Sequence, residues 1–319
     1  MINRTLVRAK VVQTLFAYYK DGESTPLTAK KELLKSFDNT YSLYMLLLDF
    51  VNEMTSLYEE REALDKERAQ VFHEVYHPKR NFVNNKFAQQ IFNNRQLRGY
   101  LKEKGYSWDV AHESLRKIFK QIVATDFFQE YQDLESPTYA DDKMVWRRIF
   151  TDVLADNEEL EAALDELEVA LDGSGWAVDA NVVISYVFKT IKRFTEESGK
   201  DQSLLEMFNS EEELTFAKDL LQKAIAGRDE YMELIDRHLK NWDLGRVAYM
   251  DIIILQTALA EIIGFPSIAL QVSMNEYLEL TKEYSTDKSS AFVNGMLNSI
   301  VDELKAENKL VKAVVLEEE

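Results

Sequence analysis

The sequence predicts an all-α protein, and three observations lead to that prediction. Glycine (10) and proline (4) are scarce among the 319 residues, whereas a turn-rich β-sandwich needs many of both. Apolar side chains recur at helical spacing over most of the chain, and no stretch of useful length alternates as a strand would. Because 46% of the residues are hydrophobic, the helices can bury a substantial core.

The first predicted helix covers residues 5–19, where apolar side chains line one side. The turn formers Gly22 and Pro26 end this helix, and helical spacing resumes from residues 28 to 69. That length predicts one long helix or two joined ones. Pro78 then interrupts the pattern, and a polar, basic segment follows it.

Helical spacing returns in the rest of the chain. A turn is expected at residues 172–175, and Ser210 followed by three glutamates resembles a helix start with acids in its first turn. The further predicted helices cover residues 108–132, 144–154, 182–194, 213–240, 245–264, 268–283 and 289–307.

Several features predict a cytoplasmic protein without a membrane partner. Cysteine is absent, which excludes disulfides, thiolate metal sites and cysteine nucleophiles and fits a reducing compartment. Residues 1–13 lack the uninterrupted apolar core of a signal peptide. The most apolar stretch, residues 250–265, is interrupted by polar residues and is too short to span a bilayer.

The net charge of −18 is unevenly distributed. Residues 150–215 hold 4 basic and 17 acidic residues, whereas residues 76–104 hold 7 basic residues and one acid. Local patches decide where a polyanion can dock. The basic segment is therefore a candidate nucleic-acid surface, and the acidic stretch is either a solvated face or a surface for a basic partner.

The last hundred residues carry a series of ordered motifs, and the N-terminus carries a weaker one. The N-terminal motif joins Arg4 and Arg8 to Gln13, Leu15 and Phe16, and it resembles the R-x-x-x-R-x-x-x-x-Q-x-L-Y of the NusB family. The C-terminal motifs are similar to the family's LRxAxxE, INEAxxxAK and FVNGxL, and they appear in order at residues 251–262, Val272-Ser273-Met274-Asn275-Glu276-Tyr277, Leu280-Thr281-Lys282 and Phe292-Val293-Asn294-Gly295-Met296-Leu297.

The resemblance implies NusB-like helical bundles with a long helical insertion after the first helix. The expected domains are an N-terminal helix at 1–20, a helical insertion at 21–210, a C-terminal helical bundle at 211–307 and a tail at 308–319. Residues 21–210 are not covered by the resemblance, and a domain that displaced the family's second helix is an equal alternative to an insertion.

The resemblance also implies a function. It is that of a transcription antitermination factor, which binds boxA-like single-stranded RNA of ribosomal-RNA transcripts together with the ribosomal protein NusE. It would do so in the antitermination complex of RNA polymerase, without catalysis or a cofactor. Asp251 stands where the family often offers an acid to NusE. One alternative is a protein-binding scaffold in ribosome assembly that does not bind RNA, and another is a domain like that of some ribosomal-RNA methyltransferases.

Two groups of cations are candidate RNA contacts. In the NusB-like part, Arg4 and Arg8 are four residues apart and share a helix face, with Lys10 off that face and Lys282 and Lys288 near the C-terminal motifs. Arginine suits phosphate because its planar group offers paired donors. The alternative is that Arg4 and Arg8 are solvated ends of an amphipathic helix.

The basic segment supplies the second group of cations. It combines them with interleaved aromatic rings and amides, which together suit single-stranded RNA. In the alternative interpretation Phe82, Phe87 and Phe92 face the core and the cations face water. The residues predicted to contact RNA here are Lys79, Arg80, Lys86, Arg95 and Arg98.

Two further patterns are given a structural interpretation. Asn294 and Gly295 lie within a predicted helix, where Gly295 would permit close approach of a neighbouring helix. Residues His73 to His77 spell HExxH, which on a helix places two imidazoles on one face for zinc. Because Pro78 follows at once, we expect no metal site there.

Overall fold

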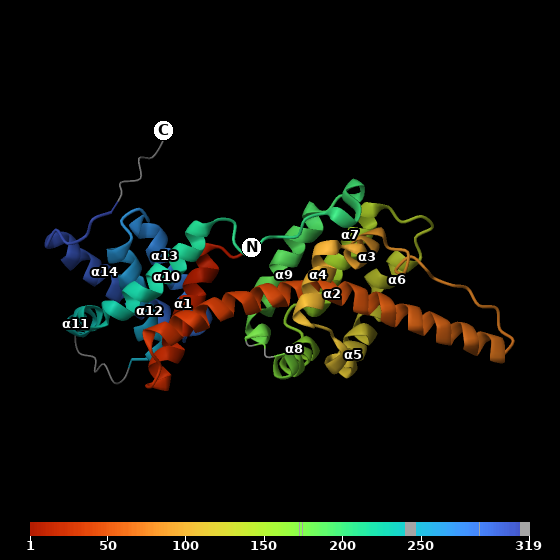
Figure 1. The fold of residues 1–319 in the computed structure, drawn as a ribbon, viewed down its shortest axis with the longest axis horizontal. Helices are drawn as coiled ribbons and strands as arrows, with labels where there is room; N and C mark the ends of the chain where they lie inside the picture. The colour runs from red at the N-terminus through yellow and green to blue at the C-terminus, as the bar shows by residue number, and fades with distance from the viewer. Residues whose placement is uncertain (172, 174, 240–246, 287, 313–319) are drawn as a thin grey trace. The chain divides into compact units, whose positions relative to one another are not determined.

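The computed structural model describes residues 1–171, 173, 175–239, 247–286 and 288–312 (Figure 1). Every named element in these ranges is helical, and the pairing of Ile2 with Phe208 is an isolated bridge. The predicted all-α fold class is confirmed. No helix in the described ranges is both long enough and apolar enough to cross a membrane.

Backbone contacts divide the chain into two compact units. The terminal unit comprises Met1–Phe37 and Met207–Glu319, and the inserted unit comprises Asp38–Glu206. The helix α2 (Pro26–Val71) is continuous and contributes residues to both units. The boundaries therefore lie at residues 37/38 and 206/207, whereas the sequence suggested 20/21 and 210/211.

The terminal unit is a bundle around one buried helix. That helix, α12 (Tyr249–Gly264), is buried without a break from Asp251 to Ile262, because apolar residues cover all of its faces. It packs against α1, α10, α11, α13 and α14 (Figure 1). The bounds of those helices are Arg4–Asp21, Glu211–Ala226, Arg228–His238, Leu270–Tyr284 and Ser289–Ala306.

Local capping explains where two of these helices begin. The Asn3 side chain accepts a hydrogen bond from Leu6 N at 3.0 Å and caps α1. A capping box formed by Ser210 and Glu213 starts α10, at the position that the sequence predicted. At the other end of α1, Gly22 has φ of 69°, a left-handed conformation that glycine adopts without steric cost.

The inserted unit has its own aromatic core, with Trp108, Trp146 and Phe82 among its fully buried side chains. Its helices after α2 are α3 (Lys86–Asn93), α4 (Arg95–Lys104), η1 (Asp109–Ala111), α5 (His112–Val123), α6 (Asp126–Gln132), α7 (Tyr139–Arg148), η2 (Ile149–Leu154), α8 (Glu158–Leu171), α9 (Trp176–Arg193) and η3 (Glu196–Asp201).

The structure corrects several predicted elements. The predicted helix at 108–132 is divided into η1, α5 and α6, and the one at 213–240 is interrupted at Gly227. The basic segment contains the helices α3 and α4, and α8 forms in a stretch for which no helix was predicted. The single long helix α2 confirms one of the two alternatives for residues 28–69.

Candidate functional site

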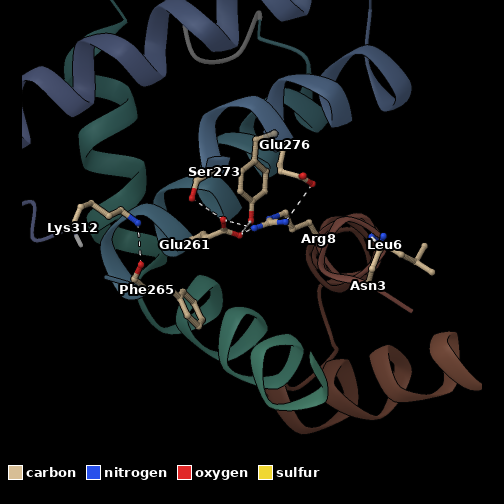
Figure 2. A network of polar contacts seen from close by, with 9 residues as sticks. Asn3, Leu6, Arg8, Glu261, Phe265, Ser273, Glu276 and Lys312 are labelled. Atoms are coloured by element: carbon tan, nitrogen blue, oxygen red, sulfur yellow. Dashed lines mark hydrogen bonds and ion pairs between the residues drawn. The ribbon is translucent and has the colours of Figure 1, made fainter. Parts of the chain in front are cut away.

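Arg8 lies at the centre of a buried polar network in the terminal unit. Its Nε and Nη2 each donate to the Glu261 carboxylate at 2.8 Å, in a paired geometry. Its Nη1 lies 3.3 Å from Glu276 Oε2, and Figure 2 shows the guanidinium reaching from α1 to these acids. Ser273 Oγ and Tyr277 OH donate to the same Glu261 carboxylate at 2.7 and 3.0 Å.

The charges in this network stabilise one another. Burial opposes the charge of Arg8, but the hydrogen bonds and negative charge of Glu261 raise the pKa of Arg8 above its usual value. Burial and the Glu261 carboxylate also raise the pKa of Tyr277 well above its usual value. Tyr277 therefore stays protonated at neutral pH and remains a donor. The network ties α1, α12 and α13 together.

Arg8 is thus a structural residue, and its predicted contact with RNA does not fit the structure. Its side chain is 2% exposed, and two carboxylates engage its donors. Reaching a phosphate would break a buried ion pair, which is costly. Lys10 is 4% exposed, so its side chain presents almost no surface to a phosphate. Arg4 is different, because it is exposed and lies over the Phe216 ring at 5.2 Å from the centroid.

The sequence pattern did not predict that Arg8 forms ion pairs with Glu261 and Glu276. Glu261 is 253 residues away from Arg8, so local spacing could not join them. One signal was available, since Glu261 is an acid inside the most apolar stretch of the chain. A charged residue is almost never fully buried unless it is paired, so such an acid indicates an internal cation.

A cavity of about 360 Å³ joins two other predicted site residues. Asp251 and Lys288 both line it, together with Val247, Ala248, Thr286, Ser289 and Phe292. Asp251 is 3% exposed and accepts a hydrogen bond from Ser285 Oγ, which ties the start of α12 to the connection between α13 and α14. Asp251 therefore presents little surface to a partner, whereas Lys288 at the start of α14 is exposed.

Lys282 lies on α13 and is exposed, with its Nζ paired to Glu279 Oε1 three residues earlier. Two contacts fix α13 against α1, namely the Arg8–Glu276 ion pair and the bond from Gln13 Nε2 to Tyr284 OH at 3.2 Å. Arg4, Lys282 and Lys288 thus lie on α1, on α13, and at the residue that precedes α14.

Most cations of the basic segment are paired with acids from other parts of the inserted unit. Lys79 and Lys86 each lie 2.6 Å from a carboxylate oxygen. The excess positive charge of the linear segment is therefore largely neutralised by the fold. The pairs are Lys79–Asp133, Arg80–Glu62, Lys86–Glu196, Arg95–Asp201, Arg98–Asp49 and Lys104–Asp38.

The amides and rings of the segment also serve mainly to build the fold. Asn85 and Asn94 cap α3 and α4, and Asn94 Nδ2 donates to Gln202 O at 2.8 Å. Phe82 and Phe87 are fully buried, as in the alternative interpretation. Phe92 departs from that interpretation, because 59% of it is exposed.

The HExxH pattern does not form the helical arrangement that zinc binding by this motif requires. The helix α2 ends at Val71, and His73 has φ of 54° in the connection that follows. His73 and His77 therefore do not share a helix face.

The positions of Asn294 and Gly295 differ from the prediction that Gly295 permits close approach of a neighbouring helix. Both are exposed on α14, and within the described part of the chain a Cβ built on Gly295 would meet nothing within 4 Å. Close approach of a neighbouring helix therefore does not explain this glycine. The Asn294 side chain accepts a hydrogen bond from Asn298 Nδ2 at 2.9 Å on the same exposed face.

Known proteins match the C-terminal part of the chain. A sequence profile of the NusB family matches residues 181–302. The transcription antitermination protein NusB of Koribacter versatilis is 40% identical over 99 residues, which are 31% of this chain and 68% of that protein. Its counterpart in Bacillus licheniformis is 35% identical over 105 residues, 33% of this chain and 81% of that protein. The NusB protein of Chloroherpeton thalassium is 39% identical over 101 residues, which are 30% of this chain and 48% of that protein. No solved structure matches.

Fold and site together define an all-helical bundle protein in which an arginine of the first helix is locked to acids of the C-terminal helices. Because the chain covers 68% and 81% of two relatives at 40% and 35% identity, it belongs to the NusB family. The profile match leaves residues 38–180, most of the inserted unit, outside the family's own sequence.

Proposed function

We propose that this protein is a transcription antitermination factor that holds boxA-like single-stranded RNA and the ribosomal protein NusE together. The observation that carries the proposal is the family membership, since the matched relatives bear the name of transcription antitermination proteins. The profile match ends at residue 302 and includes α10 to α13, which build most of the terminal unit. Its action would be non-covalent, as an adaptor.

Three exposed cations support an RNA surface on the terminal unit. They are Arg4, Lys282 and Lys288, which lie on α1, on α13 and just before α14. The ion pair of Lys282 with Glu279 is exposed at both ends, so a phosphate can replace the carboxylate at little cost. Phosphate contacts of this kind make RNA affinity depend on salt.

The cavity beside Asp251 supports a docking position for NusE. Its lining combines apolar atoms of Val247 and Phe292 with the charges of Asp251 and Lys288. A partner side chain inserted there would meet an apolar wall and the exposed charge of Lys288, while the buried Asp251 would act mainly by fixing the shape of the cavity. Lys288 then lies next to both ligands, which would couple RNA binding to NusE binding. Two ligands on adjacent surfaces reinforce each other through effective concentration.

The test is RNA binding across a salt series, with and without NusE. Wild type should bind a boxA RNA, and NusE should strengthen that binding. The double variant Arg4→Ala/Lys288→Ala should bind more weakly and lose about 0.7 from the salt slope for each phosphate contact removed. Lys305→Ala, an exposed lysine in the last turn of α14, is the matched control and should bind like wild type.

The same experiment separates the adaptor from a protein scaffold without RNA. Binding of NusE in the absence of any RNA binding would contradict the adaptor and favour the scaffold. Equal salt slopes for the double variant and the Lys305→Ala control would show that Arg4 and Lys288 do not contact phosphate.

A further inference from the structure

Part of the surface formed by α3 and α4 combines an exposed aromatic ring with cations, which are features of a nucleic-acid surface. Most other side chains of the basic segment are buried or paired within the fold. We call this part of the surface the α3–α4 ledge and define it as Phe92, Arg95, Arg98, Gly99 and Lys102. Phe92 is in the last turn of α3, and the other four residues are on α4. The segment's other two phenylalanines are buried in the core, whereas 59% of Phe92 is exposed.

The exposed ring of Phe92 is paired with a guanidinium. Arg98 Cζ lies 5.7 Å from the centre of the Phe92 ring, within the range of a cation–π contact. Arg98 also forms an ion pair with the buried carboxylate of Asp49, and this contact fixes the position of the guanidinium. Arg98 thus lies over the Phe92 ring and is itself only partly exposed, while the ring remains 59% exposed, and an exposed aromatic ring is a surface on which an unpaired base can stack.

The cations of the ledge share one face of α4. Arg95, Arg98 and Lys102 are spaced by three and four residues, and such residues are neighbours on a helix. Arg95 pairs with Asp201 at 3.3 Å, and both side chains are largely exposed, so phosphate can exchange with that carboxylate. Lys102 is exposed as well.

Gly99 lies in the interior of α4 between these cations. It is exposed, and a Cβ built on it would meet no atom of the described residues within 4 Å, so no packing contact among those residues requires a glycine. Glycine inside a helix is destabilising relative to alanine, so the fold gains nothing from it. What glycine does allow is a close approach of a ligand to the helix backbone.

We propose that the α3–α4 ledge binds single-stranded RNA, with a base stacked on Phe92 and phosphates held by Arg95 and Lys102. The proposal rests on the proposed function, because it extends the RNA footprint of an antitermination factor onto the inserted unit. Arg95, whose ion pair is exposed, and the exposed Lys102 offer a polyanion local contacts although the whole chain carries −18. Because Gly99 has no side chain, the sugar-phosphate backbone of the RNA could lie close to α4 at this position.

The test compares two RNAs on the full-length protein. One is a boxA RNA alone, and the other carries single-stranded uridine extensions of increasing length at either end. We expect the extended RNA to bind wild type more tightly than the short one. Phe92→Ala should remove that gain and leave the short RNA unaffected, weakening the extended RNA by roughly 5- to 150-fold, the range for loss of one stacked base. Gly99→Leu should also weaken the extended RNA by blocking close approach, without a clash inside the protein.

The chain offers a closely matched control for Phe92. Phe72 is also in the inserted unit, is 63% exposed, and has Arg68 Cζ at 5.9 Å from its ring centre. Phe72→Ala should therefore leave both affinities unchanged. Because Phe92 and Phe72 are both exposed, circular dichroism should show all variants folded.

The outcomes distinguish failure of the ledge from failure of the proposed function. If the short RNA binds but the extension adds nothing, or if Phe92→Ala and Phe72→Ala behave alike, the ledge does not bind RNA. If wild type binds neither RNA, the proposed function fails and the ledge fails with it. Photo-cross-linking from 5-iodouridine in the extension should label the peptide that contains Phe92, and labelling confined to other peptides would overturn the assignment.

Discussion

Replacing Arg8 with alanine would leave the Glu261 carboxylate buried without its cation. Two hydroxyl donors, Ser273 and Tyr277, would remain on that carboxylate. Removing one partner of a buried ion pair destabilises a protein by about 3–5 kcal/mol, because the remaining charge is no longer compensated. The variant also loses the second contact, to Glu276, and the cation over the Phe216 ring at 5.5 Å. We therefore expect the terminal unit to lose about 3–5 kcal/mol on Arg8→Ala.

Amide hydrogen exchange of peptides from α12 and α13 measures this loss within the terminal unit. At 1.36 kcal/mol per tenfold change, amides that exchange by opening of the bundle should exchange about 10²- to 10⁴-fold faster. Arg4→Ala is the control, since Arg4 is exposed, and should change exchange by less than about tenfold. The double variant Arg8→Met/Glu261→Gln should recover part of the loss, because it removes both charges. If Arg8→Ala left exchange in α12 at the level of Arg4→Ala, the structural role of Arg8 would be refuted.

Three further substitutions test other parts of the structure. Burial and neighbouring carboxylates raise the pKa of Glu53 from 4.5 to about 7, so the stability linked to its protonation is full below 4.5 and lost as pH rises through about 7. Glu53→Gln should raise the free energy of unfolding by about 1 kcal/mol at about pH 8, discounted for partial exposure, and by little near pH 4.5, as urea titrations would show. Gly295→Ala should stabilise α14 by about 0.5–1 kcal/mol in hydrogen exchange, since its Cβ meets open space; a destabilised α14 would contradict this. Asp142→Ala should destabilise the inserted unit by about 1–3 kcal/mol, because the buried Tyr131 OH loses an acceptor at 2.6 Å. Tryptophan fluorescence in urea measures that loss, and an unchanged midpoint would exclude it.

Periodicity predicted the fold class and the long helices, because burial of one face is encoded locally. It placed α2 and the C-terminal helices close to their observed positions. It missed the break at Gly227, which separates α10 from α11. A Cβ there would lie 2.4 Å from the Tyr231 ring, so the chain needs glycine at that point for packing. Spacing of apolar residues carries no information about such a clash.

The sequence left two uses of the basic segment open for a related reason. Its asparagines and glutamines looked like RNA contacts because their partners are far away in sequence. Asn85 Nδ2 donates to Asp142 O, and Gln90 Nε2 donates to Thr195 O. A polar, amide-rich stretch can either bind a ligand or satisfy remote backbone groups, and composition alone does not distinguish these uses. The tertiary fold decides between them.

The structure also limits which contacts the proposed RNA binding could use. Burial of Arg8 and Lys10 and pairing of most cations in the basic segment leave few groups for phosphate. The proposed RNA binding would therefore include few phosphate contacts, on a chain with a net charge of −18. Stacking on Phe92 is independent of net charge, and a second ligand bound beside Lys288 would raise the effective concentration of the RNA. On the proposed function, an acidic adaptor that spreads its contacts over several surfaces should therefore bind RNA most firmly when its partners are present together.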